Sequence, residues 1–400
     1  MQTIIAKKYQ NQDYIQEVES ILRACVHCGF CTATCPTYQL VNDELDGPRG
    51  RIYLIKELLE GNKVTSKTRV HLDRCLTCLS CETTCPSGVR YGKLIETGRT
   101  LVEKKTRRPF FNRIKRNLIL FFIPHTARFR FTLFLGRMFK YLLPGYIRKK
   151  IPDKPEQSER KQTSHARKMI LFEGCVQPAT HPEVNDTTAL VLDKMAISTI
   201  SISEVGCCGA MHHHMSKTKK SLEMIRKNID AWWPYIESGA EAIVMTASGC
   251  GAMLKEYGDL LKNDNQYAEK ARRVSELTRD ICEIISNEPD EVFNNKGQGK
   301  KVAFQSPCTL QHGQQITGVV EAILQKAGYE LTDVPDGHLC CGSAGSYALL
   351  QPEIADKLLN NKIDALESGK PDFIATANIG CHLNLAAATK TPVKHWIELV

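Results

Sequence analysis

Two dense runs of cysteine in the first quarter of the chain have a spacing suited to binding iron. Residues 25–36 read CVHCGFCTATCP and residues 75–86 read CLTCLSCETTCP, so each run follows C-x2-C-x2-C-x3-C-P. In two-cluster ferredoxins, three thiolates of such a run bind one [4Fe–4S] cluster and the fourth binds the other cluster. The sequence therefore predicts two clusters with exchanged ligands, Cys25, Cys28, Cys31 and Cys85 for the first and Cys75, Cys78, Cys81 and Cys35 for the second.

Structural zinc is the alternative for clustered cysteines in a protein without a recognisable secretion signal. Zinc sites of this kind usually use two C-x2-C pairs, which supply four thiolates in all. A third cysteine at the same spacing, and a fourth followed by Pro36 or Pro86, is poorly explained by zinc. The repeated motif therefore favours iron–sulfur clusters.

Eight further cysteines form a second pattern, which occurs twice in the second half of the chain. They are Cys175, Cys207, Cys208 and Cys250 in the first copy, and Cys308, Cys340, Cys341 and Cys381 in the second. The second copy follows the first by 133 residues, or by 131 for the last cysteine, which indicates an internal duplication. Four thiolates per copy match one cubane cluster or one zinc ion. The structural alternatives are free thiols, or a CCG turn between small buried side chains.

The elements that must position these cysteines differ between the two parts of the chain. Between the first two runs, apolar residues at helical spacing over 51–59, followed by Gly61, predict a helix. In the duplicated part, strand patterns such as KMILFEG and KVAFQS alternate with helix patterns. This alternation predicts a parallel sheet in each copy, with the cysteines on loops at the carboxyl edge of the strands. We expect the two copies to pack face to face and to gather both cysteine sets near their interface.

The predicted fold class is α+β multidomain, with an α-helical two-cluster ferredoxin domain followed by a duplicated α/β cysteine-rich domain. The expected boundaries are 1–103 for the ferredoxin domain, 104–168 for a basic connector, and 169–290 and 299–400 for the two repeats. Residues 275–288, SELTRDICEIISNE, are predicted to be one helical stretch. Cys282 in this stretch belongs to neither cysteine pattern, so we expect it to be a buried apolar side chain.

The connector accounts for the net positive charge of the chain. Residues 104–168 contain 19 Lys and Arg but three Asp and Glu, whereas the whole chain has a net charge of +9. Phenylalanine and leucine are interleaved with these basic residues, so a helix here would have one basic and one apolar face. Such a helix suits an anionic membrane surface, and a linker helix that packs on partner subunits is the equal alternative. Nucleic-acid binding is the least supported interpretation, and no nucleic-acid partner is expected.

The chain contains no run of about 18 apolar residues and no apolar leader. We therefore expect a cytoplasmic protein, with the inner face of the cytoplasmic membrane as the place of any peripheral contact. Near the clusters, Arg49 and Arg51 are expected either to supply positive charge or to be surface arginines at a helix start. His212, His213 and His214 follow the first CCG triplet, and an exposed helix start is favoured over a metal or proton-relay role.

With both cysteine patterns established, the chain resembles known families. The first part is similar to the helical ferredoxin domains of respiratory iron–sulfur proteins, and the repeats are similar to the CCG domains of heterodisulfide reductases and lactate-utilisation proteins. The segments RACVHCGFCTATCPTYQL, DELDGPRGRIYLIKELLEG, ETTCPSGVRYG, NIDAWWP and LCCGSAGSYAL together resemble the iron–sulfur subunits of bacterial glycolate oxidases. The resemblance covers essentially the whole chain and is weakest in the connector.

This resemblance implies the iron–sulfur subunit of an FAD-dependent 2-hydroxyacid dehydrogenase that uses neither NAD nor oxygen as acceptor. Flavin-containing partner subunits would oxidise glycolate to glyoxylate, with D-lactate as a further substrate, and this chain would pass the electrons towards a quinone. FAD is expected on the partner subunits only, and no catalytic residue is assigned here. Consistent with that role, no G-x-G-x-x-G opens a βαβ unit in this sequence.

The alternatives are an iron–sulfur subunit of a related lactate or glycerol-3-phosphate dehydrogenase, and a CCG-domain thiol or disulfide reductase. In heterodisulfide reductase the CCG pattern ends in C-x-x-C, but here Met253 and Asn384 stand at the fifth cysteine position. This departure argues against the noncubane clusters of that enzyme, and it leaves an ordinary cluster, zinc or free thiols for the repeats.

Overall fold

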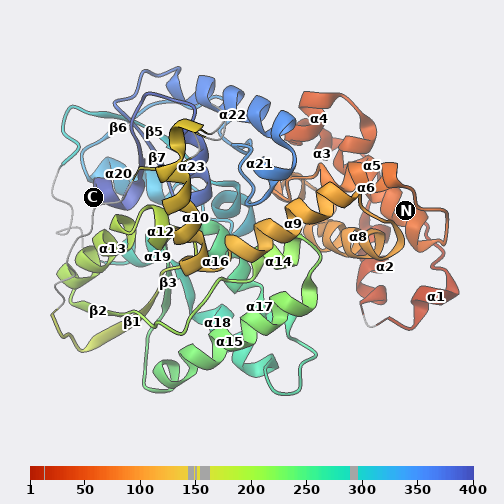
Figure 1. Ribbon diagram of the computed structural model, residues 1–400, viewed down its shortest axis with the longest axis horizontal. Helices are drawn as coiled ribbons and strands as arrows, with labels where there is room; N and C mark the ends of the chain where they lie inside the picture. Colours follow the sequence, from red (N-terminus) through yellow and green to blue (C-terminus); the bar gives the residue numbers. More distant parts are fainter. Residues whose placement is uncertain (13, 143–147, 149–150, 154–162, 289–295) are drawn as a thin grey trace. The chain divides into compact units, whose positions relative to one another are not determined.

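The computed structural model describes residues 1–12, 14–142, 148, 151–153, 163–288 and 296–400, which form two compact units (Figure 1). The first unit consists of residues 1–116 and 338–362, and the second of residues 117–337 and 363–400. Parts of the predicted connector and residues 289–290 of the predicted first repeat lie outside the described residues. The chain thus contributes two separate segments to the first unit. The boundaries predicted from the sequence place residues 338–362 in the second repeat instead.

The first unit is helical. Within residues 1–105, its longer helices are α2 (Ile15–Ala24), α5 (Pro48–Leu59), α6 (Ser66–Asp73) and α8 (Tyr91–Lys105), and its short ones are α1 (Lys7–Gln10), α3 (Phe30–Ala33), α4 (Pro36–Val41) and α7 (Ser80–Thr83). The predicted helix between the cysteine runs is confirmed as α5, which begins at Pro48 and buries Ile52, Ile55 and Leu58 at helical spacing. Gly61 follows its end in the left-handed conformation, at φ +97°.

Both cysteine runs fold in the same way. In each run the backbone adopts the left-handed conformation twice before a short helix begins, at His27 and Gly29 before α3 and at Thr77 and Leu79 before α7. Gly29 adopts this conformation without a steric penalty, whereas the same conformation at Leu79 costs about 1–2 kcal/mol. These left-handed residues therefore lie between the first and third cysteines of each run, and the third cysteine lies in the short helix.

The second unit contains two four-stranded parallel sheets with the same topology. The first has the order β2-β1-β3-β4, formed by β1 (Arg167–Phe172), β2 (Ile197–Ile200), β3 (Ile243–Met245) and β4 (Thr278–Asp280). The second has the order β6-β5-β7-β8, formed by β5 (Lys301–Gln305), β6 (Glu330–Leu331), β7 (Phe373–Thr376) and β8 (Val393–His395). This equivalence agrees with the internal duplication seen in the sequence.

Helices follow the strands as the alternating pattern predicts. The first copy contains α13 (Glu183–Lys194), α15 (Thr218–Glu237) and α16 (Ser248–Lys255), and the second contains α20 (Val319–Lys326), α22 (Pro352–Glu367) and α23 (Ile379–Ala386). One hydrophobic core includes residues of both sheets, among them Leu171 and Val244 of the first and Val302 and Phe304 of the second. The two repeats therefore pack against each other, as expected.

One local prediction is wrong. Residues 275–288 are not a single helical stretch, because α18 (Ala268–Leu277) ends where β4 begins, and α19 (Ile281–Ile285) starts after β4. Asp280 causes this break by capping α19, since its carboxylate accepts the backbone N–H of Cys282 at 3.2 Å while the Glu283 carboxylate accepts the N–H of Asp280. Cys282 is fully buried, as predicted.

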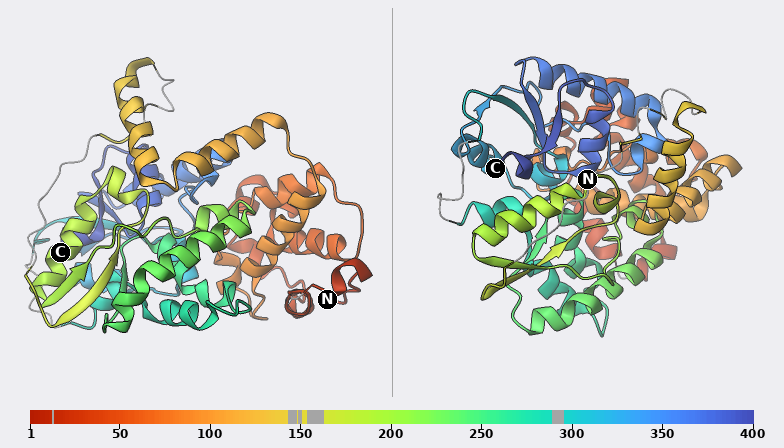
Figure 2. Two further views of the ribbon diagram at one scale, coloured as in Figure 1. Left: turned by 60° about the horizontal axis from the view of Figure 1, so that its bottom comes forward. Right: turned by 60° about the vertical axis from the view of Figure 1, so that its left-hand side comes forward.

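The connector contains α9 (Phe110–Phe122) and α10 (Thr126–Met138), which meet at a bend of 110° (Figure 2). Among the described residues no single helix has the length and apolar character needed to cross a membrane, and this bent pair passes that test only when its two helices are taken together. Both helices expose large apolar side chains, including Phe111, Phe131 and Phe134.

Candidate metal centres

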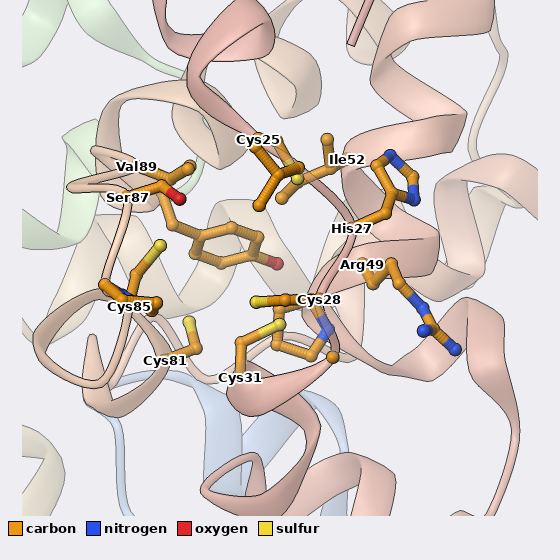
Figure 3. Close-up of a pocket in the computed structure, with 15 residues that line it drawn as sticks. Cys25, His27, Cys28, Cys31, Arg49, Ile52, Cys81, Cys85, Ser87 and Val89 are labelled. Carbon is orange, nitrogen blue, oxygen red and sulfur yellow. The ribbon is translucent and has the colours of Figure 1, made fainter.

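The first unit contains two adjacent recesses lined by cysteine. The first recess has about 450 Å³ of empty space and is lined by Cys25, Cys28, Cys31, Cys81 and Cys85. Four of these five are the ligands predicted for the first cluster, including Cys85 from the other run. Figure 3 shows that the sulfurs of these side chains surround one space. All of them are free thiols, so the donor set suits a [4Fe–4S] cluster.

The second recess has about 290 Å³ of empty space. It is lined by the four cysteines predicted for the second cluster, Cys35, Cys75, Cys78 and Cys81. Cys35 reaches this recess from the first run, as the exchanged ligation requires. Cys81 and Tyr91 line both recesses, so a single layer of side chains separates the two spaces.

The two recesses differ in exposure. Cys28 of the first recess is exposed, and Val26 and Phe30 beside it are 67% and 61% exposed. In the second recess Cys35, Cys75 and Cys81 are all buried. Burial and the neighbouring thiols Cys78 and Cys75 raise the pKa of Cys81 well above its usual value. The first recess is thus the one nearer to solvent.

Polar groups surround the second recess. Arg51 lines it with a side chain that is 1% exposed, so the surface interpretation of this arginine is wrong. Its Nε donates to the carbonyl of His71 at 2.8 Å, and its Nη1 donates to Oγ1 of Thr37 at 3.1 Å. Thr37 Oγ1 in turn lies 3.3 Å from the sulfur of Cys35. A permanent positive charge is therefore linked through one hydroxyl group to a predicted cluster ligand.

The sulfur of Cys75 accepts two hydrogen bonds. The backbone N–H of Thr77 donates to it at 3.4 Å, and the hydroxyl of Tyr91 donates at 3.7 Å. Burial raises the pKa of the Cys75 thiol, but the charges of Arg51 and Arg99 lower it further, so that it lies below its usual value. The surroundings of this sulfur therefore favour the thiolate, the form that binds metal.

Residues of the second CCG pattern also belong to this first unit. Tyr347 in α21 (Tyr347–Leu350) donates its hydroxyl proton to the carbonyl of Arg74 at 2.9 Å. Burial and the nearby thiols of Cys75 and Cys340 raise the pKa of Tyr347. Tyr347 thus lies near both a predicted cluster ligand and a cysteine of the CCG triplet.

The four cysteines of the first CCG pattern converge in the second unit. The thiols of Cys175 and Cys208 both donate to the sulfur of Cys207, and Cys208 is also paired with Cys250. These hydrogen bonds lower the pKa of Cys207 well below its usual value and raise those of Cys175 and Cys208. A thiolate at Cys207 stabilised by two thiols is a donor set that suits a cubane cluster or zinc.

The loops around this set are held by buried polar side chains. The amide of Asn228 donates to the carbonyl of Cys207 at 3.0 Å, and the hydroxyl of Tyr257 donates to the carbonyl of Cys208 at 2.8 Å. His212 in α14 (Ala210–His214) is buried, so the expected exposed helix start is wrong for this residue. Burial lowers the pKa of His212, against an opposing effect of the adjacent Cys207.

The second CCG pattern is divided between the two units. Cys308 and Cys381 lie in the second unit and Cys340 and Cys341 in the first, so the convergence of this set stays a prediction. Cys250 and Cys381 are the third residues of helices α16 and α23, and therefore lie within the first helical turn rather than on a loop.

The repeats meet close to three of these cysteines. Ser248 and Thr309 hydroxyl oxygens lie 2.8 Å apart, and the N–H of Gly249 donates to Oδ1 of Asn378 at 3.4 Å. These residues are near neighbours of Cys250, Cys308 and Cys381 in the chain. At the fifth cysteine position of each copy, the side chains of Met253 and Asn384 are buried.

The comparisons with known proteins separate the same two cysteine patterns. A family model described as a 4Fe-4S dicluster domain matches residues 21–89, and one described as a cysteine-rich domain matches residues 169–255 and 302–386. The chain is 55% identical over 401 residues to the "Glycolate oxidase iron-sulfur subunit" of Escherichia coli K12, covering 100% of this chain and 98% of that protein. The chain belongs to the family of glycolate oxidase iron–sulfur subunits.

Two further relatives and one solved structure show lower identity to this chain. The "Probable glycolate oxidase iron-sulfur subunit" of Bacillus subtilis is 27% identical, with 95% of this chain and 91% of that protein covered. "Lactate utilization protein A" of Bacillus licheniformis is 25% identical over 54% of this chain and 90% of its own length. A crystal structure of a hypothetical protein from Helicobacter pylori shares the fold, with a TM-score of 0.55 at 11% identity over 98% of this chain and 72% of that one.

Several residues around the sites were not identified from the sequence. Asp46, Tyr91, Arg99 and Tyr347 belong to neither cysteine pattern, and each acts from an element outside the runs. Tyr91 and Tyr347 do lie in the quoted segments GVRYG and GSAGSYAL, but nothing in those segments indicates which side chain turns towards a cysteine.

Proposed function

We propose that this chain is the electron-transfer component of a glycolate-oxidising complex and passes electrons from a flavin-containing partner towards a quinone. The observation that supports this most strongly is the pair of adjacent cysteine recesses, in a chain that belongs to the glycolate oxidase iron–sulfur family. The proposed ligands are Cys25, Cys28, Cys31 and Cys85 in the first recess, and Cys75, Cys78, Cys81 and Cys35 in the second.

The chain's own residues would hold, separate and shield the two centres. When bound, a [4Fe–4S] cluster accepts and releases one electron at a time. Oxidation of glycolate to glyoxylate releases two electrons and two protons, and reduction of a quinone to a quinol takes up the same number. The exposed surroundings of Cys28 suit exchange with a partner, whereas the buried surroundings of Cys75 exclude water.

Activity of the separated components tests this proposal. We expect the purified, cluster-loaded chain to show no glycolate oxidation by itself, because the chemistry at the α-carbon belongs to a flavin on a partner protein. Addition of the flavoprotein and a quinone analogue should restore glycolate-dependent quinone reduction. Turnover by the isolated chain, measured with an artificial dye as acceptor, would contradict the accessory role.

D-lactate is a second candidate substrate of the complex, because proteins named for lactate utilisation are among the relatives. The same reconstituted assay with D-lactate in place of glycolate distinguishes the two. A thiol or disulfide reductase remains the alternative function from a different class, and Met253 and Asn384 at the fifth cysteine positions argue against it.

We propose a cubane cluster or a zinc ion for the convergent set around Cys207.

We further propose that α10 contacts the membrane surface, where a quinone is dissolved. Phe131 and Phe134 are 58% and 59% exposed on this helix, next to Arg128 and Arg130. Exposed aromatic side chains beside arginines suit the interface of an anionic bilayer.

Co-sedimentation with vesicles tests this contact. The double variant Phe131→Ser/Phe134→Ser should bind phosphatidylglycerol vesicles at least about fivefold more weakly than the unaltered chain. The reason is that two aromatic side chains inserted into the bilayer interface increase the binding of a protein to the membrane several-fold. Leu190→Ser, at an exposed leucine of α13, is the matched control and should bind normally. If the unaltered chain does not co-sediment with anionic vesicles, contact of α10 with a partner protein is the better explanation for its exposed aromatic side chains.

A further inference from the structure

We propose that Arg51, assisted by Arg99, raises the reduction potential of the cluster in the second recess above that of the cluster in the first recess. Electrons that reach the first unit would then collect on the cluster in the second recess, near Tyr347. This inference rests on the proposed function, since it requires both recesses to hold [4Fe–4S] clusters. Two arginines outside the cysteine motif would thus set the reduction potential of a cluster.

The position of Arg51 carries the first step. Its guanidinium lines the second recess and is almost completely buried, and it is fixed by the carbonyl of His71 and the hydroxyl of Thr37. Its remaining nitrogen, Nη2, has no hydrogen-bond partner among the described residues and lies 3.5 Å from a carboxylate oxygen of Asp46. The charge of Arg51 therefore cannot turn away into solvent.

Asp46 does not neutralise this charge, because it is shared. Its carboxylate is fully buried, and Nη1 of Arg74 donates to Oδ2 at 2.7 Å while Nδ1 of His71 lies 3.0 Å from Oδ1. One negative charge thus faces two guanidinium groups. A net positive charge remains at the wall of the second recess.

Arg99 adds a second positive charge close to Cys75. Its Nε and Nη2 donate to the carbonyl of Leu72 at 3.0 Å, and its Nη2 also donates to the carbonyl of Cys75. Its Nη1 donates to Oγ1 of Thr77 at 2.7 Å, and the N–H of Thr77 donates to the Cys75 sulfur. Arg99 thus both contributes charge and orients a hydrogen bond to a ligand.

Arg49, the arginine that lines the first recess, is arranged differently. The side chain of Arg49 is 37% exposed, and its Nε lies 2.6 Å from a carboxylate oxygen of Glu44. Water and this carboxylate therefore weaken the electrostatic effect of Arg49 on the first recess. In Figure 3 the Arg49 side chain extends away from the sulfurs.

The physical consequence is a difference in potential. Reduction adds one negative charge to a cluster, so nearby positive charge and hydrogen bonds to the sulfurs favour the reduced state. Burial alone acts in the opposite direction, because it disfavours the more highly charged state. The same burial strengthens the field of Arg51, since charges interact more strongly where water is excluded. We infer that the arginines prevail over burial in the second recess.

The test is a potentiometric titration of the cluster-loaded full chain, followed by EPR, with Arg51→Met and Arg51→Lys compared. Cys28→Ser and Cys78→Ser identify which signal belongs to which recess. Arg51→Met should lower the ratio of reduced to oxidised second-recess cluster at least tenfold at a fixed potential, which is a shift of about 59 mV for one electron. Arg51→Lys, which keeps the charge, should recover most of the shift. The matched control is Arg90→Met, at an exposed arginine paired with Glu17 at 2.7 Å, and it should leave both potentials unchanged.

Three results would overturn the inference. These are an unmoved potential in Arg51→Met, an equal shift in Arg51→Lys, and a higher potential for the first-recess cluster in the unaltered chain. If Arg51→Met does not fold, Arg99→Met is the test. It should lower the ratio of reduced to oxidised second-recess cluster at least threefold at a fixed potential. Failure of the cluster assignment has a different signature, because the chain would then show no [4Fe–4S] signals at all. Failure of the electron-transfer role is distinct from both, because the signals would be present but the flavoprotein would support no quinone reduction.

Discussion

Replacing Cys85 by serine is expected to remove the same EPR signal as Cys28→Ser, although Cys85 is separated from Cys28 by more than fifty residues and belongs to the other run. The reason is the exchanged ligation, since Cys85 lines the first recess together with Cys28 and Cys31. The iron content should fall by about four atoms per chain. Because each run supplies ligands to both recesses, the remaining cluster should also become less stable.

Two comparisons make this result decisive. Cys35→Ser should remove the other signal, the one lost in Cys78→Ser, because Cys35 lines the second recess. Cys282→Ala, at a buried cysteine outside both patterns, should keep its full iron content and both signals. If Cys85→Ser instead abolishes the signal shared with Cys78→Ser, each run binds its own cluster and the exchanged assignment is wrong.

A second large effect is expected at Gly50, which lies in the first turn of α5 against the 3-10 turn η1 (Glu44–Asp46). A Cβ atom at Gly50 would lie 2.1 Å from the carbonyl oxygen of Glu44 and 2.7 Å from its carbonyl carbon. Both are backbone atoms, so the turn that carries Asp46 must move. Gly50→Ala should lower the free energy of unfolding of the ferredoxin unit by about 3 kcal/mol.

The measurement is urea unfolding followed by the visible absorbance of the clusters. Gly136→Ala in α10 is the matched control, since its Cβ would meet only the flexible end of Ile151, at 3.2 Å. Alanine is the better helix former, so this control should be neutral or slightly stabilising. Equal stability of Gly50→Ala and the unaltered chain would show that η1 can shift without cost.

The sequence predicts the grouping of the first eight cysteines well because ligand spacing is a local property. The two cysteine runs, α5 between them, and the alternating strands and helices of the duplicated part all follow from patterns within short segments. Cys35 and Cys85 could be placed in opposite recesses because the exchange is a property of the motif itself. The same reasoning correctly buries Cys282 in a core position.

What the sequence does not predict depends on tertiary contacts. Residues 275–288 have the apolar pattern of a helix, yet the cap at Asp280 and pairing with β3 produce a strand at 278–280. His212 is polar and lies in a histidine run, but the fold buries it near Cys207. Arg51 has the appearance of a surface residue at a helix start, and only the packing of α5 turns it inward. In each case a distant partner overrides the local pattern.

The return of residues 338–362 to the first unit affects the order in which the protein can be completed during synthesis. The N-terminal 116 residues leave the ribosome first, but Tyr347, which bonds to the carbonyl of Arg74, is made far later. At roughly 5–20 residues per second, the delay between residues 116 and 362 is on the order of 12–50 s. During that interval the surface that Tyr347 covers is open, next to the thiol of Cys75. There is therefore a stage of synthesis at which both cysteine runs are complete while the segment that contacts Arg74 is still missing.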